Sequence, residues 1–227
     1  MRVLENFSLD IRQGEIVAVM GPSGCGKSTL IRICAGLELP DEGNVEFEFK
    51  SEFQCGLSIA FQDHGLLEWL SVGENVRLAG ELRGLEVAAK SIQEVLGKVG
   101  LADFADAYPD QLSGGMRSRA ALARALLIPS SVVLLDEPFR SLDEVTALSV
   151  SIDASKLLRR RQQTVLFATH SIAEAVRVAD RVVVVSGRPM AVVREFSILL
   201  GEDERLGIES SKRDLLVRAV YEAAIEA

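Results

Sequence analysis

The segment GPSGCGKST at residues 21–29 has the residue types and spacing of a phosphate-binding loop. Its pattern is G-x-x-x-x-G-K-[ST], with Gly21, Gly26, Lys27 and Ser28 at the fixed positions. Glycines let the backbone curl so that successive N–H groups face one anion, and a helix start adds positive potential. We expect Lys27 to reach the β- and γ-phosphates of a nucleotide and Ser28 to ligate Mg²⁺. The expected nucleotide contacts are Gly21, Pro22, Ser23, Gly24, Cys25, Gly26, Lys27, Ser28 and Thr29, with Cys25 as a small filler.

Two adjacent carboxylates end the apolar segment SVVLLDEPF at 131–139. A strand sends consecutive side chains to opposite faces, so Asp136 and Glu137 cannot share one role. We expect Asp136 to hold Mg²⁺ and Glu137 to polarise an attacking water. A charged strand end that merely meets solvent is the alternative, and the phosphate loop makes it the weaker one.

Three further polar residues follow apolar segments or lie in loops. His170 ends the strand-like FATH and has the chemistry to contact a γ-phosphate, although a lone histidine is more often structural. Gln62 follows LSIAF, where its amide could bind metal or position water. His64 lies in a loop and is expected to be solvated.

The segment DQLSGGMRSR at 110–119 is a second helix start with exposed N–H groups, because a serine precedes two glycines. By itself it predicts an N-capped helix and nothing more.

Alternating strands and helices must position these groups. The pattern predicts an α/β core with parallel strands, and a helical segment at about 71–128 that packs on one side. Half-buried strands are expected at 3–11, where Phe7, Leu9 and Ile11 alternate with polar residues, and around Val45, Phe47 and Phe49. The other expected strands are 15–20, 57–61, 131–136, 164–169, 181–185 and 190–195, and the other expected helices begin at 27 and span 144–160, 171–179 and 211–225.

Composition narrows the class of protein. The net charge of −8 argues against a nucleic-acid-binding surface, which normally carries a basic stripe. Cys25, Cys34 and Cys55 share no CxxC spacing, so a metal site or a disulfide framework is not indicated. The longest apolar strings are strand-sized, which predicts a soluble, intracellular chain.

The order GPSGCGKST, Gln62, LSGGM, LLDEP, SLD and His170 closely resembles the ATP-binding-cassette (ABC) ATPase family over nearly the whole chain. The LSGG motif separates this family from other P-loop proteins. The resemblance implies a P-loop NTPase fold of the ABC type in a single nucleotide-binding domain, 1–227. That fold has a mixed sheet core with an N-terminal antiparallel β part, and the helical subdomain at about 71–128 is inserted in it.

The same resemblance implies that two domains pack head to tail. The LSGG helix of one domain then faces the phosphate loop of the other. Ser113, Gly114 and Gly115 would contact the γ-phosphate of ATP held in the partner, and Asp143 would communicate between the two sites. Glu137, His170 and Gln62 are the implied catalytic residues, and Ser28, Gln62 and Asp136 are the implied Mg²⁺ ligands.

Three segments look like the importer subfamily that handles nitrate, sulfonates, taurine and related solutes. The implied partners are integral membrane permease subunits, a second copy of the chain and, indirectly, a solute-binding protein. The implied location is peripheral, on the cytoplasmic face of the inner membrane, with Leu66, Leu67 and Trp69 as candidate permease contacts. An ATP-binding scaffold or regulator, or the ATPase of a lipid transporter or exporter, is the alternative. The three segments are FQDHGLLEWLSVGENV, YPDQLSGGMRSRAALARAL and DEPFRSLD.

The chain also departs from the sequence pattern of the ABC ATPase family in three places. It lacks the aromatic residue that relatives carry upstream of Val3-Leu4 to stack on adenine. Glu68 stands where relatives tend to have proline, and Arg140 stands where glycine is common.

Overall fold

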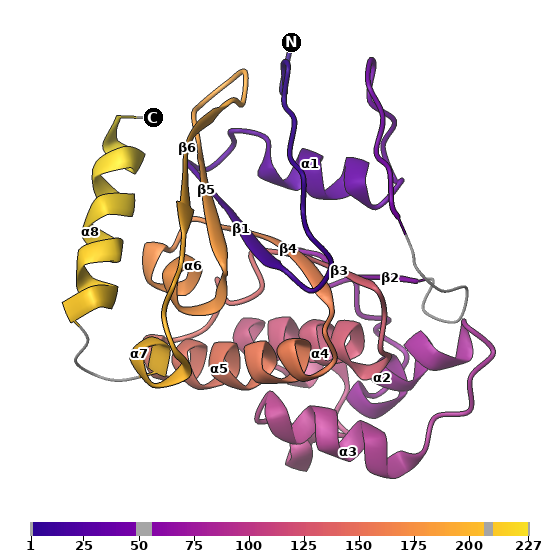
Figure 1. The fold of residues 1–227 in the computed structure, drawn as a ribbon. Helices are drawn as coiled ribbons and strands as arrows, with labels where there is room; N and C mark the ends of the chain where they lie inside the picture. Colours follow the sequence, from indigo (N-terminus) through magenta and orange to yellow (C-terminus); the bar gives the residue numbers. More distant parts are fainter. Residues whose placement is uncertain (1, 49–55, 207–210, 227) are drawn as a thin grey trace.

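A six-stranded sheet forms the centre of the computed structural model, which describes residues 2–48, 56–206 and 211–226 (Figure 1). The strand order is β2-β3-β4-β1-β5-β6, with the first five strands parallel and β6 antiparallel to β5. The strands are β1 (Ile16–Met20), β2 (Leu57–Ala60), β3 (Val132–Asp136), β4 (Thr164–Thr169), β5 (Arg181–Val185) and β6 (Val192–Ser197).

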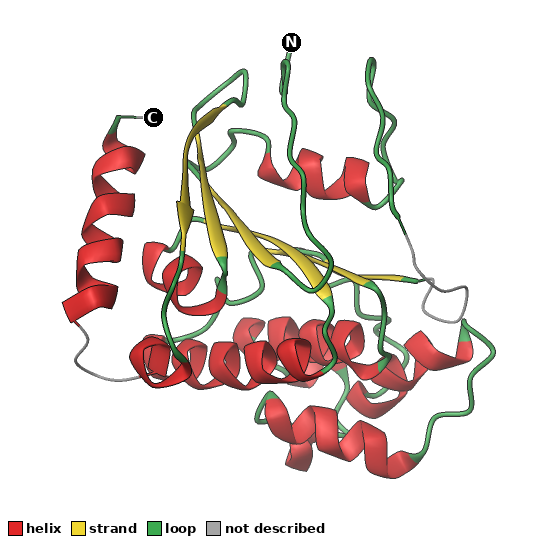
Figure 2. Cartoon of the chain, viewed as in Figure 1, coloured by secondary structure: helices red, strands yellow, loops and turns green. Residues whose placement is uncertain are grey.

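Helices cover the sheet, and further helices lie beyond it on one side of the molecule (Figure 2). Helix α1 lies on one face, while α4, α5 and α6 lie on the other (Figure 1). The helices are α1 (Lys27–Cys34), α2 (Val72–Glu81), α3 (Ala89–Lys98), α4 (Gly114–Leu127), α5 (Glu144–Arg160), α6 (Ile172–Val178), α7 (Glu202–Leu206) and α8 (Ser211–Ile225).

Continuous apolar segments explain why the central strands lie between two helical layers. All five residues of β1 and of β3 are buried, as expected for parallel strands covered on both faces. Val133 and Leu135 join a cluster with the helices α2 to α6, whereas Val132 and Leu134 join a smaller cluster with α1. Side chains therefore alternate between two cores along one strand.

The N-terminal segment does not form the expected antiparallel β part. Within the described residues 2–12, Leu4 makes only an isolated bridge, to Met190. Asn6 has a φ of 53°, which breaks an extended path, and no neighbouring strand offers a ladder. Phe7, Leu9 and Ile11 are nevertheless half-buried against the α1-side cluster, so their alternation was interpreted correctly as a core-facing pattern.

The strand expected around Val45 and Phe47 is also wrong for the residues that the structure describes. Residues 41–48 are exposed and have no core face to favour an alternating strand. Phe49 and Cys55 lie outside the described residues. The antiparallel pair of the sheet is at the opposite end of the chain, between β5 and β6.

The helical segment is confirmed. Residues 71–128, all of which are described, contain α2, α3, α4 and short 3₁₀ turns but no strand. Ser71 caps α2 through a reciprocal pair of hydrogen bonds with Glu74, the arrangement that a serine followed three residues later by glutamate favours.

A buried arginine ties the C-terminal segment to the sheet. Arg205 of α7 donates to the carbonyl oxygens of Leu200, Ile198, Arg177 and Ala179, and it contacts Asp180. The helix α7 was not expected from the sequence.

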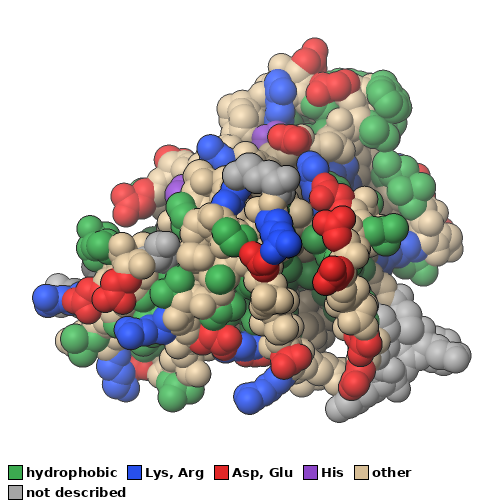
Figure 3. Space-filling model, turned by 90° about the horizontal axis from the view of Figure 1, so that it is seen from above, with side chains coloured by type: hydrophobic (Ala, Val, Ile, Leu, Met, Phe, Trp, Pro, Cys, Tyr) green, Lys and Arg blue, Asp and Glu red, His purple; other side chains and the backbone are tan. Residues whose placement is uncertain are grey.

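Acidic and basic side chains are mixed over the face seen in Figure 3 rather than gathered into separate fields. None of the described helices has the length and apolar character needed to cross a membrane.

Candidate active site

The carboxyl ends of four neighbouring strands bring the expected site residues to one edge of the sheet. Met20 is level with Thr169, and Asp136 is level with Ala168. The strand order therefore places Gln62, the 136–137 carboxylates, His170 and the phosphate loop in sequence along this edge. A carboxyl edge of parallel strands is where α/β folds bind ligands.

The phosphate loop follows β1 directly and has the backbone of an anion site. Gly26, the residue before α1, has a φ of 126°, which a side chain would make strained. No side chain caps α1 and no acidic residue occupies its first turn, so its N–H groups can receive an anion. Lys27 is buried, and its Nζ donates to the carbonyl oxygens of Gly21 and Pro22 at 2.8 and 2.9 Å.

Asp136 is a buried carboxylate beside this loop. Burial raises the pKa of Asp136, and a hydrogen bond from Ser28 opposes that rise. The Oδ1 atom has no hydrogen-bond partner among the described residues, although it is buried. An unpartnered carboxylate oxygen next to a phosphate loop is the donor that Mg²⁺ requires, because this ion takes one or two carboxylates together with substrate phosphates.

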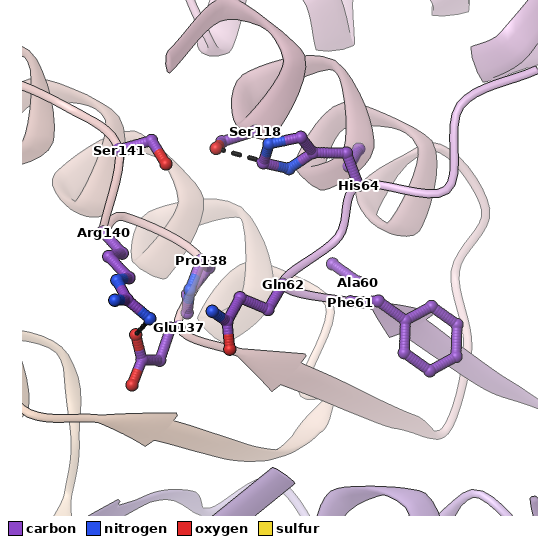
Figure 4. Close-up of a pocket in the computed structure, with 10 residues that line it drawn as sticks. Ala60, Phe61, Gln62, His64, Ser118, Glu137, Pro138, Arg140 and Ser141 are labelled. Carbon is purple, nitrogen blue, oxygen red and sulfur yellow. Dashed lines mark hydrogen bonds and ion pairs between the residues drawn. The ribbon is translucent and has the colours of Figure 1, made fainter. Parts of the chain in front are cut away.

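Glu137, with a φ of 49°, lies between the guanidinium of Arg140 and the imidazole of His170. Its carboxylate is 8% exposed. Arg140 Nη1 lies 3.0 Å from Oε2, and His170 Nδ1 lies 3.5 Å from Oε1 (the Arg140 pair is drawn in Figure 4). Glu137 and His170, two of the implied catalytic residues, therefore lie side by side, whereas the Arg140 contact was not expected.

A second carboxylate supports the turn that carries His170. Thr169 Oγ1 donates to Glu174 Oε2 at 2.7 Å, and Ser171 N donates to Thr169 Oγ1 at 3.0 Å. Burial raises the pKa of Glu174, and the Thr169 hydrogen bond opposes the rise. Glu174 was missed in the sequence, although its spacing from Ser171 is that of a helix start.

A pocket of about 100 Å³ lies beside Glu137 (Figure 4). Gln62 is exposed at its edge, which leaves its amide accessible. His64 is half-buried rather than solvated: its Nδ1 lies 3.4 Å from Ser118 Oγ, and Arg124 donates to its carbonyl oxygen. The loop after β2 is therefore attached to α4. The residues around the pocket include Gln62, His64, Ser118, Glu137, Arg140 and Ser141.

The glycines of the second helix start differ in their surroundings. Ser113 caps α4 by accepting from Met116 N at 3.2 Å, which confirms the N-capped helix. A Cβ on Gly115 would lie 2.6 Å from the carbonyl oxygen of Ser141, whereas a Cβ on Gly114 would meet nothing within 4 Å. Gly115 thus lets this chain's own 141–142 turn approach α4, and Gly114 faces open space.

Two further predicted residues have local structural contacts. Asp143 caps α5 by accepting from Thr146 N at 3.0 Å. Hydrogen bonds from the side chain and then the backbone of Thr146 lower the pKa of Asp143. Trp69 is 73% exposed, while Leu66 packs against the main core. The loop between them and α2 is held by Asn75, whose amide donates to the carbonyl oxygens of Leu67, Leu70 and Ser71.

Comparison with known proteins decides the family. The family model described as "ABC transporter" matches residues 4–140. The chain belongs to the ABC transporter ATP-binding family. As a member of it, the chain binds and hydrolyses ATP.

Two of the three relatives reported for this ABC ATPase have importer names. It is 38% identical over 225 residues to an aliphatic sulfonates import ATP-binding protein of Pseudomonas syringae pv. tomato, covering 99% of this chain and 91% of the relative. A taurine import ATP-binding protein of Jannaschia sp. is 35% identical over 219 residues, covering 95% and 81%. An uncharacterized ABC transporter ATP-binding protein of Methanocaldococcus jannaschii is 43% identical over 197 residues, covering 83% and 72%.

A solved structure shares the fold of this ABC ATPase. The ATP-binding cassette MJ0796, in a dimeric post-hydrolysis state with ADP and phosphate, superposes with a TM-score of 0.76 at 32% identity. The match covers 88% of this chain and 92% of that one, so the predicted P-loop NTPase fold of the ABC type is confirmed.

Proposed function

We propose that this ABC ATPase is the motor subunit of an importer of small solutes in the sulfonate and taurine class. The observation that carries the proposal is the carboxyl edge, where the phosphate loop, Asp136, Glu137 and His170 stand on neighbouring strands. The names of the sulfonate and taurine relatives supply the solute class. We include residues 1–227 in one nucleotide-binding domain, with the helices of 71–128 as its inserted subdomain.

The phosphate loop binds the nucleotide. Residues 21–29 present backbone N–H groups to the phosphates, and Lys27 exchanges its contacts with Gly21 and Pro22 for the β- and γ-phosphates. Asp136, Ser28 and Gln62 would hold Mg²⁺, and the unpartnered Oδ1 of Asp136 supports that assignment. When bound, the ion neutralises charge on the phosphates.

Glu137 accepts a proton from, or orients, the water that attacks the terminal phosphate. His170 contacts that phosphate from β4, and its turn is held by Thr169 and Glu174. Catalysis in phosphoryl transfer comes mainly from positioning and charge, so residues fixed at strand ends suit it.

The second helix start completes the site in a partner copy. Ser113, Gly114 and Gly115 contact the terminal phosphate of ATP in the partner, and Asp143 links the two sites. The dimeric MJ0796 cassette and the open space in front of Gly114 support this arrangement. ATP thereby stabilises the closed dimer, and hydrolysis releases it.

The exposed Trp69 and its neighbours Leu66 and Leu67 face the membrane permease subunits, at the cytoplasmic face of the inner membrane. Asn75 holds this loop in one conformation, which suits a docking surface. A solute-binding protein delivers the solute on the other side of the membrane.

Affinity purification from membranes tests the partner assignment. Wild-type chain should retain permease subunits, and Trp69→Ala should lose them while the matched exposed variant Leu82→Ala keeps them. Both side chains are largely exposed, at 73% and 79%. Recovery of no membrane protein with the wild type would reject the importer proposal and favour a scaffold.

Size-exclusion chromatography tests whether two copies of the chain form the proposed dimer. With MgATP, Glu137→Gln should elute as a dimer, and Gly114→Leu in the same background should remain monomeric while it still binds MgADP. A Gly114→Leu chain that dimerises normally would reject the contact in trans.

A further inference from the structure

Arg140 makes a direct contact with the carboxylate proposed to activate water. Its Nη1 lies 3.0 Å from Glu137 Oε2. The carboxylate is buried, with 8% of its side chain exposed, while the arginine side chain is 49% exposed. Figure 4 shows the two side chains directed toward each other at the pocket. The arginine is therefore the partner with room to move.

The contact is an attraction between charges rather than a well-directed hydrogen bond. Glu137 Oε2 is buried and has no partner of good hydrogen-bond geometry among the described residues. A guanidinium forms stronger, bidentate contacts with carboxylate or phosphate oxygens when both of its donors are aligned. In the observed Arg140–Glu137 contact, the guanidinium does not form this bidentate arrangement.

Both oxygens of Glu137 face nitrogen atoms, because His170 Nδ1 lies 3.5 Å from Oε1. A water that is to be polarised by Glu137 needs one of these oxygens. Oε2 is buried, with Arg140 Nη1 3.0 Å away, so movement of the arginine would open this oxygen to water.

The phosphate loop lies at the same edge of the sheet as the carboxylate that Arg140 contacts. In the sheet, β3 and β1 are separated only by β4, so their ends are about 10 Å apart. Burial raises the pKa of Asp136 most, and the Ser28 hydrogen bond lowers it. The charges of Glu137, which raises this pKa, and of Lys27, which lowers it, are also close enough to act on Asp136. Lys27, Asp136 and Glu137 thus belong to one electrostatic cluster, and Arg140 joins it through its contact with Glu137.

We propose that Arg140 exchanges partners during the cycle, pairing with Glu137 before nucleotide binds and with the terminal phosphate of a bound nucleoside triphosphate afterwards. The exchange frees Oε2 for the attacking water and adds positive charge where the transition state needs it. It makes Arg140 a catalytic residue that distinguishes triphosphate from diphosphate. The inference rests on the proposed role of Glu137 and not on transport.

The test compares equilibrium binding of a non-hydrolysable ATP analogue and of ADP, both with Mg²⁺, to wild type and Arg140→Gln. A lost charge-assisted contact to phosphate lowers affinity for the triphosphate about tenfold, and ADP affinity should stay within about twofold. The kcat for ATP hydrolysis by Arg140→Gln should also fall. Arg140→Lys should restore part of the triphosphate affinity and part of the kcat. Arg160→Gln removes an equal charge from an exposed helix end and is the matched control.

Measurements in the Glu137→Gln background distinguish an arginine that exchanges Glu137 for phosphate from one that contacts phosphate in every state. Without the competing carboxylate, the triphosphate should bind several-fold more tightly, and Arg140→Gln should then reduce its affinity by more than in wild type. Equal losses for triphosphate and diphosphate would overturn the inference. Faster hydrolysis by Arg140→Gln with unchanged binding would also overturn it, because the arginine would then only restrain Glu137. Hydrolysis that survives Glu137→Gln would instead reject the proposed role of Glu137.

Discussion

The two adjacent glycines at the start of α4 should respond oppositely to the same substitution. A Cβ at position 115 would lie 2.6 Å from the carbonyl oxygen of Ser141 and 3.3 Å from Leu142 Cδ2. The nearer atom is backbone, so the 141–142 turn must shift as a unit. Overpacking of this kind lowers the free energy of unfolding by about 1–3 kcal/mol.

At position 114 the added methyl group meets nothing within 4 Å. Replacing a helical glycine by alanine without a clash raises the free energy of unfolding by about 0.4–1 kcal/mol, because the unfolded chain loses conformational freedom. The two variants should therefore differ by about 1.5–4 kcal/mol. With a urea slope of about 2 kcal/mol/M, their midpoints should be separated by about 0.7–2 M.

Urea unfolding of wild type, Gly114→Ala and Gly115→Ala, followed by circular dichroism, measures this difference. The slopes must agree among the three proteins for the comparison to hold. A Gly115→Ala protein as stable as wild type would refute the reasoning, because the 141–142 turn would then not depend on a side-chain-free approach to α4.

Three other outcomes follow from the contacts described above. Arg205→Met should lower the free energy of unfolding by about 3–5 kcal/mol in urea titration, because several buried carbonyl oxygens lose their donor, while Asp180 keeps its contacts with Arg159 and Ile16 N. A loss below about 1 kcal/mol would show that water replaces the guanidinium. Burial raises the pKa of Glu174 above its ordinary 4.5, so ionisation of this carboxyl lowers the free energy of unfolding. That loss of stability is absent below pH 4.5 and complete above the raised pKa. Glu174→Gln should therefore raise the melting temperature relative to wild type more at pH 8 than at pH 4, and a gain independent of pH would contradict this. Burial also raises the pKa of the Cys34 thiol to about 11, so iodoacetamide at pH 8 should label the Cys34 peptide far more slowly than a free cysteine; labelling at the free rate would show that the thiol is exposed.

The residues at the strand ends could be predicted because apolar segments and their polar termini are local patterns. Asp136, Glu137 and His170 were expected at the ends of apolar segments, and the parallel register brings those ends to one edge. The N-terminal strand was predicted wrongly, since alternation reports which side chains face a core and not whether a neighbouring strand exists to pair with. This distinction explains why Phe7 is half-buried in a segment without a ladder.

The contacts missed from the sequence all depend on tertiary packing. Arg140 reaches Glu137 because the chain turns sharply after β3, where Glu137 has a positive φ. Glu174 and Thr169 meet across a turn, and Asn75 meets a loop that precedes its own helix. Residue type alone does not indicate which of many polar side chains will have such partners.

The position of β1 has a consequence for synthesis. Among the described strands, β1 leaves the ribosome before the others, yet it pairs with β4 and β5, and Ile16 is in register with Val165. At about 5–20 residues per second, the apolar IVAVM segment waits roughly 7–30 s for its neighbours. Folding must therefore be slow relative to proteins with local pairing, and the nascent chain presents an unpaired strand during that interval. A holdase chaperone that binds the first part of the chain should increase the yield of folded protein.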